Sequence, residues 1–237
     1  VMSGRADGDM LILGMGTGTY AKQCQYYYHP SSIEGVEIDQ KITDLAGRYF
    51  ELPDSIPVTT YDGRSYLAAV EETYDVIMVD AYQDITIPFQ MSSLEFFTLV
   101  REHLNENGVM VVNMNMHSDA EGNINEHLSD TIASVFDYVY TVDVAGTTNR
   151  ELFATQNPEA VEFFESGRSE IEDPELTAML QRVSDGLMPY EKGDYLLTDD
   201  KAPVELLGMQ VIDDLIQREL VYYKDLFKRE GIQGLLQ

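Results

Sequence analysis

The stretch "LILGMGTGTYAK", residues 11–22, decides how the rest of the chain is interpreted. An apolar run stops at Gly14, and glycine returns at Gly16 and Gly18 before a segment with helical spacing. Glycines at this spacing allow the backbone to turn sharply and to approach a ligand closely. The stretch therefore predicts a strand, a ligand-binding turn and a helix, the first unit of an α/β fold.

Apolar runs and helical patterns continue to alternate after this unit. Each of the first four predicted strands is followed by a segment with helical spacing. Such alternation favours a parallel sheet that is covered by helices on both faces. The five predicted strands lie in "DMLILG", "SIEGVEID", "IPVTTYD", "YDVIMVDAY" and "GVMVVNMN".

The pattern changes after residue 137. The β-rich runs "DYVYTVDV" and "RELFATQ" are separated only by the turn-rich "AGTTN", whereas a parallel pair needs a longer crossover. We therefore predict a Rossmann-like, mostly parallel sheet of seven strands that ends in an antiparallel hairpin. We expect one domain over residues 1–237, with residues 158–237 as its helical extension. An apolar stripe over residues 211–227 predicts core packing, with a homodimer contact as the alternative.

Acidic residues dominate the charge of the 237-residue chain, whose formal net charge is −27. Such a field repels nucleic acids and anionic membrane surfaces and attracts cations. We therefore expect no nucleic-acid partner and no direct membrane contact. Two explanations of the charge stay open: a solvated acidic surface, and a preference for a small cationic substrate.

The ends and the cysteine count give further expectations. The apolar runs are far shorter than the roughly 18 residues of a membrane span, and the start "VMSGRADGD" lacks the regions of a signal peptide. We expect a cytoplasmic location, either for a free protein or for one domain of a membrane-anchored protein. The early first strand fits a trimmed chain as well as a natural start. Cys24 is the only cysteine, which excludes an internal disulfide and a cysteine-based zinc site.

The glycine turn does not match the motifs that bind phosphate groups. A dinucleotide fingerprint needs a third glycine where Thr19 stands, and a P-loop needs a lysine at the helix start. Glu37 ends the second strand, where a carboxylate can accept hydrogen bonds from ribose hydroxyls. Asp62 and Gly63 follow the third strand, where they can contact an adenine amino group, although Asp-Gly is also ordinary turn chemistry. Together these positions indicate an adenosine without a diphosphate.

Four segments resemble a known family. "LILGMGTGT", "GVEID", "YDGRSYL" and "YDVIMVDAY" resemble the first motifs of class I S-adenosylmethionine-dependent transferases, and more narrowly those of the spermidine synthase family of polyamine aminopropyltransferases. "LTDDKAPVELL" is similar to the tail of bacterial spermidine synthase-like proteins, some of which carry an upstream membrane-spanning domain. The resemblance covers about residues 10–113 and the tail.

The resemblance implies a ligand and the residues that bind it. The ligand is decarboxylated S-adenosylmethionine or S-adenosylmethionine, giving 5′-methylthioadenosine or S-adenosylhomocysteine as product. No metal is expected, since no grouping of His, Asp and Glu has ligand spacing. The nucleoside-binding residues implied are Gly14, Gly16, Gly18, Glu37, Ile38, Asp62, Gly63 and Asp80.

Asp80 ends the fourth strand, where its carboxylate can orient an amine or accept its proton. The resemblance implies that Tyr82 adds a cation–π contact and that Asp84 holds the far ammonium of a diamine. Two features depart from the family. "DAYQD" stands where D-S-S-D is usual, and no small β-domain precedes Met10 to enclose the amine.

Three functions follow from these residues. The first is aminopropyl transfer from decarboxylated S-adenosylmethionine to a putrescine-like diamine. The altered acidic loop and the missing β-domain favour a second, a small-molecule methyltransferase that uses S-adenosylmethionine. A third is a non-catalytic module that binds a nucleoside or a polyamine. Asn113, Asn115 and His117, in "NMNMHSD", either line the same crevice or form an ordinary loop.

Overall fold

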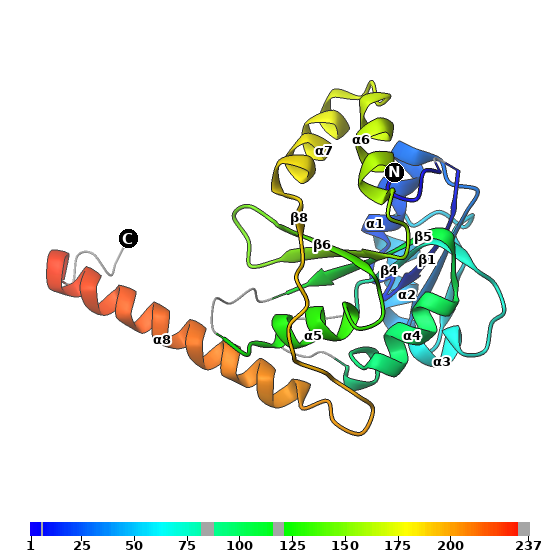
Figure 1. The fold of residues 1–237 in the computed structure, drawn as a ribbon. Helices are drawn as coiled ribbons and strands as arrows, with labels where there is room; N and C mark the ends of the chain where they lie inside the picture. The colour runs from blue at the N-terminus through cyan, green and yellow to red at the C-terminus, as the bar shows by residue number, and fades with distance from the viewer. Residues whose placement is uncertain (6, 82–87, 116–120, 232–237) are drawn as a thin grey trace.

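The computed structural model describes residues 1–5, 7–81, 88–115 and 121–231. Its centre is a sheet with the strand order β3-β2-β1-β4-β5-β7-β6-β8 (Figure 1). The chain order of the sheet reverses between β1 and β4, which is where ligands bind in open α/β sheets. The strands are β1 (Asp9–Leu13), β2 (Ser32–Glu37), β3 (Val58–Thr60), β4 (Tyr74–Val79), β5 (Leu104–Met114), β6 (Tyr138–Asp143), β7 (Arg150–Thr155) and β8 (Met188–Pro189).

The mostly parallel sheet and its hairpin are confirmed. Strands β3, β2, β1, β4 and β5 pair in parallel, whereas β7 pairs antiparallel with both β5 and β6. The predicted count of seven strands is wrong, because β8 adds an eighth, antiparallel to β6. β8 has only two residues, too few to give a periodic pattern in the sequence. It is recognised as a strand only by its pairing with β6.

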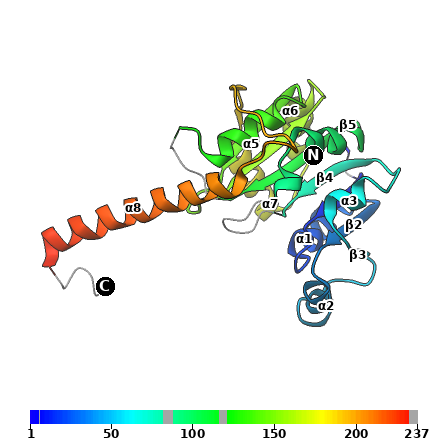
Figure 2. The ribbon, with the colours of Figure 1, turned by 90° about the horizontal axis from the view of Figure 1, so that it is seen from below.

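Helices cover both faces of this sheet (Figure 2). One face packs against α1 (Thr19–Tyr28), α2 (Gln40–Tyr49), α6 (Ala160–Ser169) and α7 (Pro174–Gly186). The other face packs against α3 (Gly63–Leu67), the 3₁₀ helix η1 (Phe89–Met91), α4 (Leu94–Glu102), α5 (Ile124–Ile132) and the start of α8 (Val204–Glu230). The fully buried residues of β1, such as Leu11 and Ile12, contribute alternately to the two layers.

Side-chain caps fix where five of these helices begin. Each capping side chain accepts a hydrogen bond from a backbone N–H of the first helical turn, which that helix cannot satisfy internally. The caps of α2, α3, α4, α5 and α7 are Asp39, Asp62, Ser93, Asn123 and Asp173. The first two caps lie directly after β2 and β3, so they also shape the loops at the ligand-binding edge.

Helix α8 corrects one expectation. Val204, Leu207 and Val211 are buried against the core, but Ile216 and Phe227 are about half exposed, at 50% and 49%. Figure 1 shows the C-terminal half of α8 extending away from the sheet. The apolar stripe therefore packs on the core only at its start, because the helix is longer than the layer it covers. Over the described residues, none of the helices combines the length and the apolar character that crossing a membrane requires.

Candidate active site

The glycine turn after β1 lies at the carboxyl edge of the sheet, beside the ends of the neighbouring strands β2 and β4. Gly14 and Gly16 have left-handed φ values of 89° and 55°. A Cβ at Gly14 would lie 2.5 Å from the Asp80 carbonyl oxygen, so only glycine permits this close approach to the end of β4. A Cβ at Gly16 would meet nothing within 4 Å. The backbone at Gly16 therefore borders open space that a ligand can approach.

Gly18 has a different role from the other two glycines. It is the N-cap of α1, with φ 79°, and a Cβ there would lie 2.5 Å from Leu52 Cδ1. Leu52 belongs to the core layer beneath α1. The structure thus accounts for Gly18 by close packing, whereas it places Gly16 against free space.

Glu37 ends β2 beside this turn, and its side chain is buried. Its Oε2 accepts a hydrogen bond from the Gly16 N–H at 2.9 Å, and its Oε1 accepts one from the Asp39 N–H at 3.0 Å. A carboxylate has about four acceptor positions, so about two stay available for ribose hydroxyls. The next residue, Ile38, is 70% exposed, which leaves an apolar surface directly beside these acceptors.

Asp62 is the N-cap of α3, a role that the sequence analysis did not assign to it. Its Oδ1 accepts a hydrogen bond from the Ser65 N–H at 2.8 Å. Burial acts to raise the pKa of Asp62, but the hydrogen bonds from Ser65 and Gln90 and the charge of Arg64 together outweigh it, so the pKa is lowered. The Tyr61 N–H donates to the Glu37 carbonyl at 3.1 Å, which holds the Asp62–Gly63 loop next to the end of β2.

Asp80 lies at the switch point, directly after β4. Its N–H donates to the Leu13 carbonyl at 2.9 Å, and its Oδ1 accepts a hydrogen bond from Asn113 Nδ2 at 3.0 Å. The Asn113 Oδ1 in turn accepts from Asn149 Nδ2 at 3.1 Å. Burial raises the pKa of Asp80, opposed by the bond from Asn113. Asn113 therefore orients the carboxylate, which is more than an ordinary loop residue does.

Three residues from the sequence analysis lie outside the described part of the chain. They are Tyr82 and Asp84, with predicted contacts to the amine, and His117. The loops that the structure does describe bring together the remaining predicted positions from the ends of β1, β2, β3 and β4. Where the structure describes the chain, it contains no group of three or more His, Cys, Asp or Glu side chains arranged to hold a metal ion.

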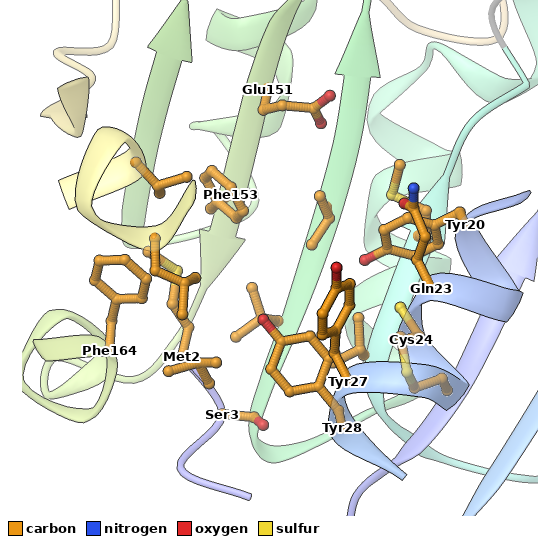
Figure 3. A pocket seen from close by; sticks show the side chains of 18 of the residues that line it. Met2, Ser3, Tyr20, Gln23, Cys24, Tyr27, Tyr28, Glu151, Phe153 and Phe164 are labelled. Atoms are coloured by element: carbon orange, nitrogen blue, oxygen red, sulfur yellow. The ribbon is translucent and has the colours of Figure 1, made fainter. Parts of the chain in front are cut away.

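A cavity of about 600 Å³ extends along one face of the sheet from Asp80. Its floor consists of alternate residues of β4, β5 and β7, because every second side chain of a strand points to the same face. The covering side chains come from α1, α6 and α7 (Figure 3). Gly16 and Glu37 do not line the cavity, so Asp80 stands between it and the nucleoside loops. The floor residues are Val76, Met78, Asp80, Val109, Val111, Asn113, Glu151 and Phe153.

Glu151 on β7 is the site residue that the sequence analysis missed. It pairs with Asn113 across β5 and β7, and Figure 3 shows its carboxylate at one end of the cavity. Burial and the charge of Asp80 raise the pKa of Glu151 to about 7. The signal in the sequence was an acid two residues before Phe153, on the same face of the strand. That signal has meaning only once β7 is known to lie beside β5.

A family model described as the spermine/spermidine synthase domain matches residues 2–156. A "probable polyamine aminopropyl transferase" of Bifidobacterium longum (strain NCC 2705) is 56% identical over 243 residues, covering 95% of this chain and 54% of that relative. The chain thus spans about half the length of this curated relative.

Two crystal structures share the fold. Spermidine synthase in complex with the transition-state analogue AdoDATO matches with a TM-score of 0.65 and 16% identity, covering 79% of this chain and 69% of that one. Human methyltransferase-like protein 13 in complex with SAH matches with a TM-score of 0.59 and 24% identity, covering 84% and 96%. The likeness at these identities concerns the α/β architecture, a Rossmann-like fold with a mostly parallel sheet.

Proposed function

The chain belongs to the spermine/spermidine synthase family, and from this premise we propose that it transfers an aminopropyl group from decarboxylated S-adenosylmethionine to a diamine. One observation carries the proposal. Asp80 lies between the loops of Gly16 and Glu37 on one side and the cavity on the other. A donor and an acceptor bound on the two sides would both reach this carboxylate, with putrescine as the main candidate for the acceptor.

The residues at the strand ends fit an adenosyl group. Glu37 offers acceptors for ribose hydroxyls, and the open space at Gly16 allows close approach to the backbone. Ile38 provides an exposed apolar surface for a base, beside the Asp62–Gly63 loop. The donor, when bound, supplies a carbon activated by a neighbouring sulfonium. This chain's residues contribute binding, orientation and a proton acceptor.

Asp80 is the residue to which we assign the proton. The amine nitrogen forms its bond to the aminopropyl carbon while the carbon–sulfur bond breaks and its electron pair stays on sulfur. Asp80 accepts the proton that the nitrogen loses, and the hydrogen bond from Asn113 keeps the carboxylate oriented. The raised pKa of Asp80 favours this acceptance. Tyr82 and Asp84 remain predicted amine contacts from the sequence.

The acids at this edge also support the decarboxylated donor. Where the structure describes the chain, no Lys or Arg forms an ion pair with Asp80 or Glu151. Both donors carry the same amino group, but S-adenosylmethionine also carries a carboxylate, which these acidic side chains would repel. This argues against the methyltransferase alternative, which uses S-adenosylmethionine itself.

The test is product formation by the chain. Incubation with decarboxylated S-adenosylmethionine and putrescine should give spermidine and 5′-methylthioadenosine in equal amounts, measured by mass spectrometry. Asp80→Asn should lower kcat by about 10²–10⁴-fold and leave the Kd of the nucleoside nearly unchanged. S-adenosylhomocysteine formed from S-adenosylmethionine would favour the methyltransferase instead. Nucleoside binding without any product would favour the binding module.

A further inference from the structure

Glu151 shares the cavity with Asp80 but has no part in the transfer described above. Val79 pairs with Val112 and Asn113 pairs with Glu151, so Asp80 and Glu151 lie on either side of β5. Their backbones are therefore about 10 Å apart, at two strand spacings. Both side chains line the same cavity, with Asn113 between them.

No cation within the described residues neutralises this pair of acids. Neither Asp80 nor Glu151 takes part in an ion pair there. Tyr20 on α1 faces the pair, and burial raises the pKa of its hydroxyl well above its ordinary value, which keeps it neutral near pH 7. The other charged groups of the cavity are the Val1 ammonium and Arg5 near the N-terminus, and Glu175 and Arg182 on α7.

The opposite end of the cavity does not suit a charge. Met2, Phe164 and Leu176 are buried there in one apolar cluster. Figure 3 shows Met2 and Phe164 at a distance from the Glu151 carboxylate along the cavity. A second ammonium group among these apolar side chains would lose its hydration, and the acid on that side, Glu175 of α7, is exposed to solvent. Among the described residues, Glu151 is the acid that shares the polar end of the cavity with Asp80, whereas Asp84 lies outside the described residues.

We propose that Glu151 binds the ammonium group of a diamine that does not react, while Asp80 faces the nitrogen that does. The assignment rests on the proposed aminopropyl transfer and adds to it the residue that distinguishes a diamine from a monoamine. The two carboxylates belong to residues at the ends of β4 and β7, which flank β5 on either side. This separation suits two ammonium groups that are joined by a short alkyl chain. The apolar floor of the cavity, including Val111, lies beneath that chain.

The electrostatics of the empty cavity agree with this assignment. Burial and the neighbouring charge of Asp80 raise the pKa of Glu151 to about 7, so holding both acids ionised is unfavourable. A bound dication compensates both charges. Diamine binding should therefore draw Glu151 into its ionised form and release a proton near pH 7.

The experiment compares putrescine with butylamine, which has the same carbon chain and only one amine. Calorimetry in the presence of 5′-methylthioadenosine gives the Kd of each for the wild type and for Glu151→Gln. We expect the substitution to weaken putrescine binding by about 10- to 100-fold, the loss of one charge-assisted contact. Butylamine binding should change by less than about twofold. Glu162→Gln, an exposed acid on α6 that does not line the cavity, is the matched control and should change neither Kd.

Several outcomes would overturn the assignment. Equal weakening of both amines would mean that Glu151 supports the fold of the site, and no weakening would mean that it has no role. The same holds if the wild type fails to bind putrescine more tightly than butylamine. If putrescine binding were weakened in Glu175→Gln and not in Glu151→Gln, the second ammonium group would lie toward α7 instead. Absence of turnover with either amine would count against the proposed function, while the Kd comparison would still decide the role of Glu151.

A pH series gives a second, independent result. The ratio of the butylamine Kd to the putrescine Kd should grow as pH rises through about 7 in the wild type, following the ionisation of Glu151. The ratio should stay flat in Glu151→Gln, because ionisation of Asp80 affects both amines. A ratio that rises equally in both proteins would contradict the assignment.

Discussion

Glu37 connects two loops through one carboxylate. Each of its oxygens accepts one backbone N–H, from Gly16 and from Asp39. The sequence predicted an acid at the end of β2, since a strand followed by a helix leaves this position at the carboxyl edge. It did not predict the bond to Gly16, because that contact depends on how β1 and β2 pair. The prediction from sequence therefore reached the residue but not its geometry.

Replacing Glu37 with Gln should weaken nucleoside binding. The amide keeps one acceptor and presents a donor to the second backbone N–H, so the cradle loses a charge-assisted hydrogen bond. We expect the affinity for 5′-methylthioadenosine to fall by about 1–3 kcal/mol, measured by calorimetry. Glu106→Gln, an exposed acid on β5, is the control. An unchanged affinity would exclude Glu37 from the nucleoside site.

Glu151 should reduce stability at neutral and alkaline pH. The pKa is about 7 in the folded chain against an ordinary value of 4.5, so the folded state holds the proton more tightly. The free energy of unfolding therefore falls as pH rises from about 4.5 to about 7, by as much as about 3 kcal/mol. Glu151→Gln lacks this decrease.

Urea denaturation over this pH range measures the effect. The free energy of unfolding of Glu151→Gln should increase relative to that of the wild type as pH rises from about 4.5 to about 7. The burial of the amide contributes equally at each pH, so the shift rather than the absolute difference is the result. Parallel pH curves for the two proteins would show that the Glu151 pKa is ordinary.

At the scale of elements, the tail segment before α8 is joined to α3 and α4. Arg64 donates two hydrogen bonds to Asp199, both of 2.7 Å, and the Ser93 hydroxyl donates a third of 2.6 Å. Since α3 begins at the Asp62 cap, this contact also supports the loop at the ligand-binding edge. The sequence identified the tail by its resemblance, but 135 residues separate Arg64 from Asp199, so no local pattern pairs them.

Asp199→Asn should destabilise the chain in a pH-dependent way. Asp199 is partly exposed, so the loss should be modest, about 1 kcal/mol at pH 7. The Arg64 guanidinium lowers the pKa of Asp199, which places the stabilisation above the ordinary pKa of an aspartate. The difference between variant and wild type should therefore vanish as pH falls through the lowered pKa, as measured by thermal unfolding. A difference that is constant with pH would mean that the ion pair does not contribute.

The elements show why sequence prediction succeeded and where it stopped. β1 and β4 are buried on both faces, and such strands give continuous apolar runs that are easily recognised. β8 has no pattern of its own, and the outer half of α8 repeats the spacing of a buried helix although Ile216, Tyr223 and Phe227 are exposed. Periodicity tells which residues share a face, but not whether another element covers that face.

At the scale of the whole molecule, the net charge of −27 left two explanations open. If the field attracts the substrate, a dication should feel it about twice as strongly as a monocation. Raising the ionic strength from about 0.05 M to about 0.5 M should then raise the KM of putrescine severalfold and that of butylamine less. Salt-independent KM values would favour a solvated surface with no part in substrate attraction.

The central claim is that one crevice holds a nucleoside at the ends of β1, β2 and β3 and a diamine between Asp80 and Glu151. The most direct measurement is a crystal structure of the chain with 5′-methylthioadenosine and putrescine. We predict nucleoside density beside Gly16 and Glu37, with one putrescine nitrogen at each of the two acids. Nucleoside density away from these residues, or putrescine bound outside the cavity, would contradict the account.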